Sequence, residues 1–123
     1  MNKLFILAIV LAPAIIAFSC KHDPVLPETQ VSFSNDIQPI LQMGCSHAGC
    51  HGDSLNPEFK LVTYEQVMDK GEVEPGNPRG SELYHVLITN NEEDKMPRSP
   101  YPELNDRNKK LIYIWIAQGA KNN

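Results

Sequence analysis

The sequence has few of the residues on which a large protein core depends. Only 7% of its 123 residues are aromatic, with one tryptophan, and a chain of this length buries a marginal amount of apolar surface. Basic residues are also few, 11 Lys and Arg against 15 Asp and Glu, which argues against nucleic acid as a partner. The apolar run from Leu4 to Phe18 is broken by Pro13 and is short for a bilayer span. One small domain is therefore predicted.

The start of the chain has the pattern of an export signal. Lys3 gives a positive beginning, an apolar run follows, and the run ends in Ala17-Phe18-Ser19-Cys20. This segment resembles a bacterial lipoprotein signal, which implies that residues 1–19 are removed and that Cys20 becomes the lipidated first residue. Ordinary signal cleavage nearby, which would leave Cys20 as a free thiol, is the alternative.

Residues 20–32 follow as a polar, proline-containing segment without a period, which predicts a tether on which a membrane-anchored domain, residues 33–121, stands off the lipid. Lys21 after Cys20 gives no Asp-type retention signal of the enteric bacterial kind. The protein is therefore expected in a bacterial cell envelope, on the periplasm-facing side of the outer membrane.

The most informative stretch is Cys45-Ser46-His47-Ala48-Gly49-Cys50-His51-Gly52. A histidine directly after the second of two nearby cysteines is the mark of covalent haem attachment, in which both thiols add to porphyrin vinyl groups and the histidine binds the iron. The usual loop has two residues between the cysteines, and this loop has four. Cys45 and Cys50 are predicted to hold a haem c, with His51 as the proximal iron ligand.

Two other uses of these residues stay open. Cys45, His47, Cys50 and His51 have the composition of a Cys₂His₂ zinc site, although all four lie in one short loop, whereas zinc sites that build small domains usually join two separate segments. Cys45 and Cys50 could also form a simple disulfide.

The far side of a haem needs a second ligand, and Met96 is the candidate. A thioether is a soft, neutral iron ligand, and a methionine in so polar a loop has little structural reason to be there. His85, in a predicted helix, is the main rival. Met43 and Met68 are expected in the core, and His47 is expected to face water.

The apolar spacing predicts four short helices. The first is expected over about 34–43, beginning at Asn35 or Asp36 because Pro39 is tolerated best in a first turn. The last helix, near 106–118, has apolar residues outside its main stripe, so it is expected to be buried on more than one side. The other helices are expected near 64–68, 81–88 and 106–118, capped by Thr63, by Ser81 or Asn77, and by Asn105.

Together these pieces resemble the c-type cytochromes, and most closely the small planctomycete-type cytochrome c domain of exported bacterial lipoproteins. The Cys-His pair is the most specific part of the match, and the four-residue gap is the departure from it. The matching residues are Phe33, Asp36-Ile37, Pro39-Ile40-Leu41, Cys45, Cys50-His51-Gly52, Pro75-Gly76-Asn77-Pro78, Ser81, Leu83, Met96-Pro97, Trp115-Ile116 and Gly119-Ala120.

This resemblance implies an all-α, cytochrome c-like fold of three to five short helices and long loops around one haem c, with His51 and Met96 on the iron. It also implies a carrier of single electrons between a redox donor and acceptor, and not an enzyme. If Met96 does not bind, the alternative is a haem enzyme or a gas- or peroxide-binding protein with an open iron site. A zinc-binding or structural lipoprotein is the remaining alternative.

Overall fold

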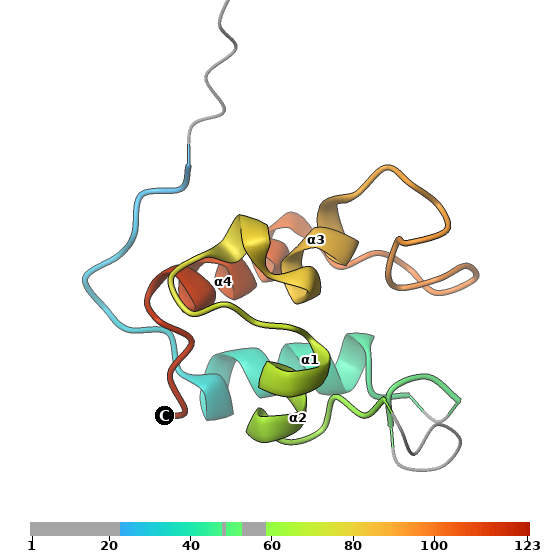
Figure 1. Ribbon diagram of the computed structural model, residues 1–123, viewed down its shortest axis with the longest axis horizontal. Helices are drawn as coiled ribbons and strands as arrows, with labels where there is room; N and C mark the ends of the chain where they lie inside the picture. The colour runs from blue at the N-terminus through green and yellow to red at the C-terminus, as the bar shows by residue number, and fades with distance from the viewer. Residues whose placement is uncertain (1–22, 48, 53–58) are drawn as a thin grey trace, which may run out of the picture.

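The structure, a computed structural model, describes residues 23–47, 49–52 and 59–123, and every regular element in these ranges is helical (Figure 1). This confirms the predicted all-α class for the described residues. The predicted signal segment 1–19 and the predicted lipidation site Cys20 lie outside them. The elements in chain order are η1 (Phe33–Ile37), α1 (Gln38–Gly44), α2 (Tyr64–Lys70), η2 (Pro78–Gly80), α3 (Glu82–Ile88) and α4 (Asp106–Ala117).

The first helix begins earlier than predicted. Ser32 is its cap, and the Ser32 Oγ accepts the backbone N–H of Asn35 at 3.2 Å, so the predicted start at Asn35 or Asp36 is wrong. The first turn, η1, is a wide π-type turn in which the N–H of Gln38 donates to the carbonyl of Phe33, five residues back. Widening this turn accommodates Pro39, because a proline ring clashes with the carbonyl four residues before it in an ordinary α-helix.

The next helices use the predicted caps only in part. Thr63 caps α2 through a reciprocal capping box. Asn77 caps η2 by accepting the N–H of Gly80 at 3.1 Å. Ser81 precedes α3, but its fully buried hydroxyl accepts the N–H of Glu74 at 2.9 Å and donates to the carbonyl of Asn77. Ser81 therefore occupies the cap position of α3 without a capping hydrogen bond there, and Asn77 caps η2 and not α3.

Helix α4 is the centre of the core. Asn105 caps it as predicted, and the whole run Ile112–Ile116 is buried, which confirms burial on more than one side. The ring of Trp115 lies 5.5 Å from that of Phe33 in η1 and 6.4 Å from that of Tyr64 in α2. The first and last helices therefore pack on each other, and the first described residues, from Asp23, and the C-terminus lie on the side of the molecule opposite the loop after α3 (Figure 1).

The described part of the predicted tether packs on the domain. Val31 is buried, and its N–H donates to Oε1 of Gln118 at 2.8 Å. The amide of Gln118 in turn donates to the carbonyl of Thr29 at 3.1 Å. Arg79 pairs with Asp23 at 2.6 Å, which raises the pKa of the guanidinium further. From Asp23 onward, these contacts hold parts of this segment, residues 23–31, called the strap below, against the domain.

Within the part of the chain that the structure describes, no helix is long and apolar enough to cross a membrane.

Candidate functional site

The predicted attachment loop begins where α1 ends. The N–H of Cys45 still donates to the carbonyl of Leu41 at 2.8 Å, so the first cysteine sits on the last helical turn. The chain then folds back, with the N–H of Cys50 donating to the carbonyl of His47 at 2.9 Å and that of His51 to the carbonyl of Cys45 at 3.1 Å. Both thiols are unpaired, so the alternative of a Cys45–Cys50 disulfide is not what this structure contains.

Gly52 closes the loop by a close approach of backbone to backbone. A Cβ at this position would lie 2.4 Å from the carbonyl oxygen of Ser46 and 3.0 Å from that of His47. No side chain fits at such distances, so the glycine after His51 is required for the loop to fold back on its own gap.

His51 is oriented by a backbone carbonyl. Its Nδ1 lies 3.0 Å from the carbonyl oxygen of Phe59, and the two rings lie 4.8 Å apart. Because a carbonyl only accepts, Nδ1 carries the proton in this hydrogen bond, which leaves the lone pair on Nε2. This is the arrangement by which metal-binding histidines are fixed, and Phe59 is the acceptor that the sequence did not identify.

Met96 reaches the site from the loop that follows α3. Its N–H donates to the carbonyl of Val86 at 2.9 Å, and the residue is half-buried. His85, the rival ligand, is exposed. Met68 packs against the core as expected, but Met43 is 68% exposed, so its prediction as a core residue is wrong. Met43 lies off the stripe of buried residues that Ile37, Ile40 and Leu41 form on this helix.

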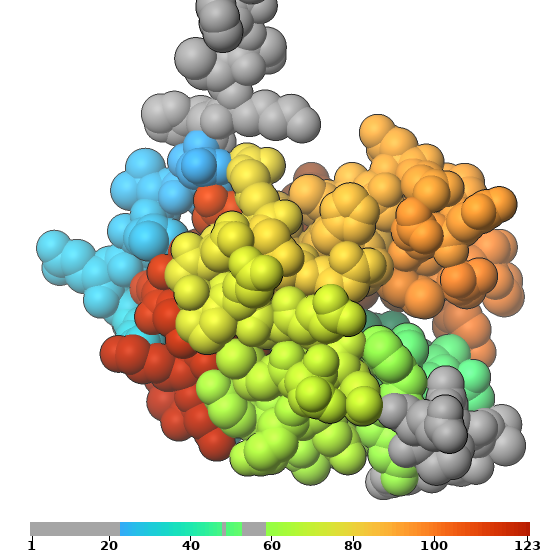
Figure 2. Space-filling model, viewed as in Figure 1, coloured from blue at the N-terminus to red at the C-terminus, as the bar shows by residue number. Residues whose placement is uncertain are grey.

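Two adjoining hollows, of about 340 and 440 Å³, bring the predicted residues together. Both are lined by Cys45, His51 and Met96, and the smaller one also by Cys50. Figure 2 shows the opening between the loop after α3 (orange) and the residues after α1 (green). Each hollow has a volume typical of small-molecule and cofactor sites.

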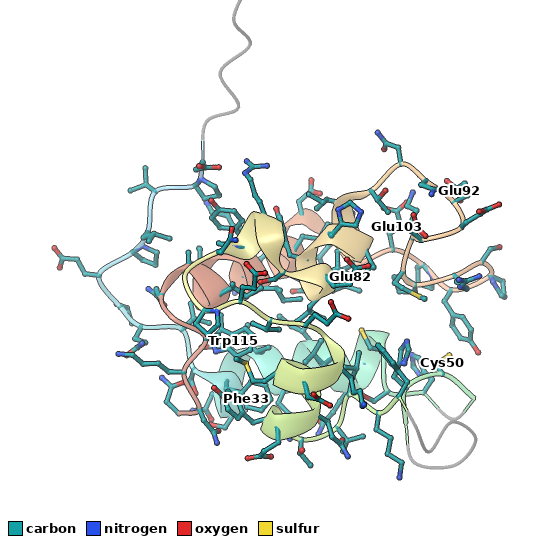
Figure 3. The ribbon with its side chains drawn as sticks, in the orientation of Figure 1. Phe33, Cys50, Glu82, Glu92, Glu103 and Trp115 are labelled. Carbon is teal, nitrogen blue, oxygen red and sulfur yellow. The ribbon has the colours of Figure 1, made fainter. Side chains whose placement is uncertain are left out.

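The larger hollow has an apolar interior and a charged mouth. Its apolar lining comes from the loop after the cysteines and from α3, namely Phe59, Leu61, Leu83, Val86 and Leu87. The charged residues around it are Lys70, Glu72, Glu82, Glu93, Asp94 and Arg98. In Figure 3, Cys50 lies on the lower side of the opening and Glu92 on the loop above it. The space therefore suits an apolar group with polar edges.

Burial controls the chemistry of the inner thiol. Cys45 is 8% exposed, and this burial, with a smaller effect of the charge of Cys50, raises the pKa of the Cys45 thiol to about 11. The thiol is therefore neutral at physiological pH. The Cys45 thiol lines the hollow from a buried position and is not displayed as an exposed nucleophile.

Two ion pairs that share Glu103 link the Met96 loop to α4. Glu103 accepts hydrogen bonds from the side chains of Lys95 at 2.6 Å and Lys109 at 3.0 Å, which lower the pKa of the Glu103 carboxyl to about 2. Lys95 directly precedes Met96 in the sequence, so this cluster fixes the base of the loop that carries the methionine.

The four residues of the zinc alternative are not assembled into a metal site. Across the ranges 23–47, 49–52 and 59–123, no group of three or more His, Cys, Asp and Glu side chains is placed to hold a metal ion. His47 is exposed to water as expected, and its ring stacks on that of Tyr101 at 5.5 Å.

A comparison with protein families, curated proteins and solved structures finds no match for the chain. What the protein does therefore has to follow from the residues of these hollows.

Proposed function

We propose that the chain is an exported, lipid-anchored, monohaem c-type cytochrome that carries single electrons between redox proteins. The observation that carries the proposal is convergence: Cys45, Cys50 and His51 from one loop and Met96 from a distant loop line one hollow. A haem c needs these four side chains, two thiols and two axial ligands, around one space.

The lining fits a haem in three further respects. The thiols of Cys45 and Cys50 are free to form thioether bonds. The Nδ1–H of His51 is engaged by Phe59, so Nε2 is the nitrogen left for iron. The apolar side chains of the larger hollow supply the contacts that a porphyrin face requires. A haem held here would supply one-electron redox chemistry at its iron.

The residues themselves define what that haem does. With His51 and Met96 both bound, the iron has no position open for a substrate, which supports electron transfer and not catalysis. Thioether ligation also raises the reduction potential relative to two nitrogen ligands. The chain would hold both ligands, exclude water from the apolar interior of the larger hollow and leave one edge of the cofactor reachable.

The setting is proposed from the sequence pattern around Cys20, which places the domain in a bacterial cell envelope. The partners are then a redox donor and acceptor, met through small and transient interfaces. Carboxylates outnumber cationic side chains around the mouth of the larger hollow, which favours partners that present a basic surface.

An optical spectrum of the purified protein tests the proposal. If His51 and Met96 both bind the iron, the spectrum should be low-spin in both redox states. In the ferric state it should also show the weak near-infrared band of a methionine–iron bond. A high-spin ferric spectrum without that band would instead support the alternative of an open iron site for gas or peroxide. No haem spectrum at all, after expression with a haem-attachment system, would contradict both.

A further inference from the structure

The four-residue gap of the attachment loop contacts the segments that support both proposed iron ligands. The gap consists of Ser46, His47, Ala48 and Gly49, where the usual loop has two residues. Its first two residues make specific contacts in opposite directions, one toward the side of His51 and one toward the loop of Met96.

Ser46 fastens the segment that carries the hydrogen-bond acceptor of His51. Its Oγ donates to the carbonyl of Leu61 at 2.9 Å, and the N–H of Leu61 donates to the carbonyl of His51 at 2.9 Å. Leu61 is therefore held on both sides of its backbone. Phe59 is only two residues earlier, so the same contacts fix the carbonyl that lies 3.0 Å from Nδ1 of His51.

His47 reaches the other side of the hollow. Its ring lies 13° from parallel to that of Tyr101, with the ring centres 5.5 Å apart, and both residues line the hollow together with Met96. The N–H of Tyr101 donates to the carbonyl of Arg98 at 3.0 Å, which closes the turn that follows Met96. The stack therefore joins the attachment loop directly to the methionine loop.

We infer that the longer gap is a positioning bracket: the hydroxyl of Ser46 sets the hydrogen bond between His51 and Phe59, and the ring of His47, through Tyr101, holds the Met96 loop closed. The inference rests on the proposed haem attachment. It assigns Ser46, His47 and Tyr101 as positioning residues that act through the two ligands and need not touch the iron.

The Ser46 side is tested by the reduction potential of the haem-loaded full chain. Donation from Nδ1–H to a carbonyl makes the imidazole a stronger electron donor and favours ferric iron. In Ser46→Ala this hydrogen bond is weakened, so the potential should rise, with an about threefold shift of the ferric-to-ferrous ratio at a fixed poise, or about 30 mV at 59 mV per tenfold.

Two controls separate positioning from general stability. Ser46→Thr keeps the hydroxyl and should keep the wild-type potential. Ser34→Ala removes a comparable surface hydrogen bond, from Ser34 Oγ to the carbonyl of Asn123 at 2.8 Å, far from the hollow, and should also leave the potential unchanged. A wild-type potential in Ser46→Ala, or loss of haem loading in both Ser46 variants, would overturn this side of the bracket.

The His47 side is tested by displacement of the methionine. Tyr101→Ala should bind added imidazole at the iron at least about threefold more tightly, because the Met96 loop is no longer held, whereas Tyr101→Phe keeps the ring and should match the wild type. His47→Ala combined with Tyr101→Ala should add little to the single change, since both remove one contact. Unchanged imidazole affinity in Tyr101→Ala would overturn the proposed role of His47 and Tyr101 in holding the Met96 loop.

These outcomes are distinct from failure of the proposed function. If the wild-type chain carries no covalent haem, both proposals fail. If the wild type is a six-coordinate haem protein but neither Ser46→Ala nor Tyr101→Ala shifts its measured property, the bracket alone is wrong.

Discussion

At the scale of single residues, His51 shows how the proposed attachment loop would hold an imidazole for an iron. The loop presents the imidazole, and the backbone of Phe59, eight residues later, fixes its proton on Nδ1 at 3.0 Å. The ligand and its acceptor therefore come from the same fold-back of the chain. The distal candidate, Met96, is supported differently, through its own backbone and through the charged cluster around Glu103.

Replacing Met96 tests its proposed role. In Met96→Ala the haem-loaded protein should lose the near-infrared methionine band, and its reduction potential should fall, because a thioether favours ferrous iron more than water or nitrogen ligands do. Redox titration with visible and near-infrared spectra measures both. Met43→Ala, at an exposed methionine, is the matched control and should change neither. If Met96→Ala keeps the band and the potential, the ligand is another residue.

The Glu103 cluster predicts a pH dependence of definite sign. The pKa of the Glu103 carboxyl falls from its ordinary 4.5 to about 2 in the folded protein, so the cluster stabilises the fold above about pH 4.5 and its contribution is lost as the pH falls toward 2. The group is half-exposed, so salt weakens the effect.

Thermal unfolding of the wild type and of Glu103→Gln across this range measures the contribution. The wild type should unfold at the higher temperature at pH 7, and the difference should shrink to nothing near pH 2. A difference that persists at pH 2 would show that the substitution acts through something other than the charge.

At the scale of elements, the helices follow from local sequence, apart from one start. Thr63 and Asn105 cap their helices as predicted, since a cap depends on a few neighbouring residues. The predicted start at Asn35 or Asp36 assumed that Pro39 must lie in the first turn of the whole helix, whereas a π-type turn capped by Ser32 precedes the turn that contains Pro39. The exposure of Met43 agrees with helical spacing, which places it off the stripe of Ile37, Ile40 and Leu41, so the error came from judging this residue by its apolar character alone.

The residues of the site likewise differ in whether local sequence predicts them. The sequence predicts the two thiols, His51 and Met96 as site residues because each belongs to a short, recognisable pattern, and the structure brings them to one hollow. Phe59, Ser46 and Tyr101 could not be predicted, because Phe59 acts through a backbone carbonyl that any residue possesses, and the other two act through contacts that depend on how distant loops close. Such partners have no sequence signature of their own.

The packing of η1 on α4 predicts a large loss of stability when its central ring is removed. Phe33 is 3% exposed and contacts the rings of Tyr64 and Trp115. Phe33→Ala should lower the free energy of unfolding by about 3–5 kcal/mol, measured by urea titration with circular dichroism. Ile88→Ala, at an exposed position of α3, should cost less than about 1 kcal/mol. Equal losses would contradict this assignment of the core.

At the scale of the whole molecule, the strap of residues 23–31 limits how the domain can move on an anchor. The strap is held by Gln118, which bonds the carbonyls of Pro27 and Thr29 and the N–H of Val31. With the proposed lipid on Cys20, only three residues before Asp23, the contacts of the strap would keep the domain close to the membrane surface. The strap lies on the opposite side of the ribbon from the loop after α3 (Figure 1).

Limited proteolysis tests the docking of this strap. Val25 and Leu26 are exposed and would be cleaved readily in a free tether. Gln118→Ala removes three hydrogen bonds, so cleavage between residues 23 and 31 should become about tenfold faster than in the wild type. Lys110→Ala, at an exposed position on the same helix, should have no effect. Equal cleavage rates in all three proteins would contradict a docked strap.

The most direct test of the central claim is the mass of the denatured chain after expression with a haem-attachment system. If Cys45 and Cys50 hold a haem, the denatured chain should carry the added mass of one haem, and peptide mapping should place this mass on the segment that contains both cysteines. A denatured chain with no added haem mass would contradict the assignment of these residues as a haem attachment loop.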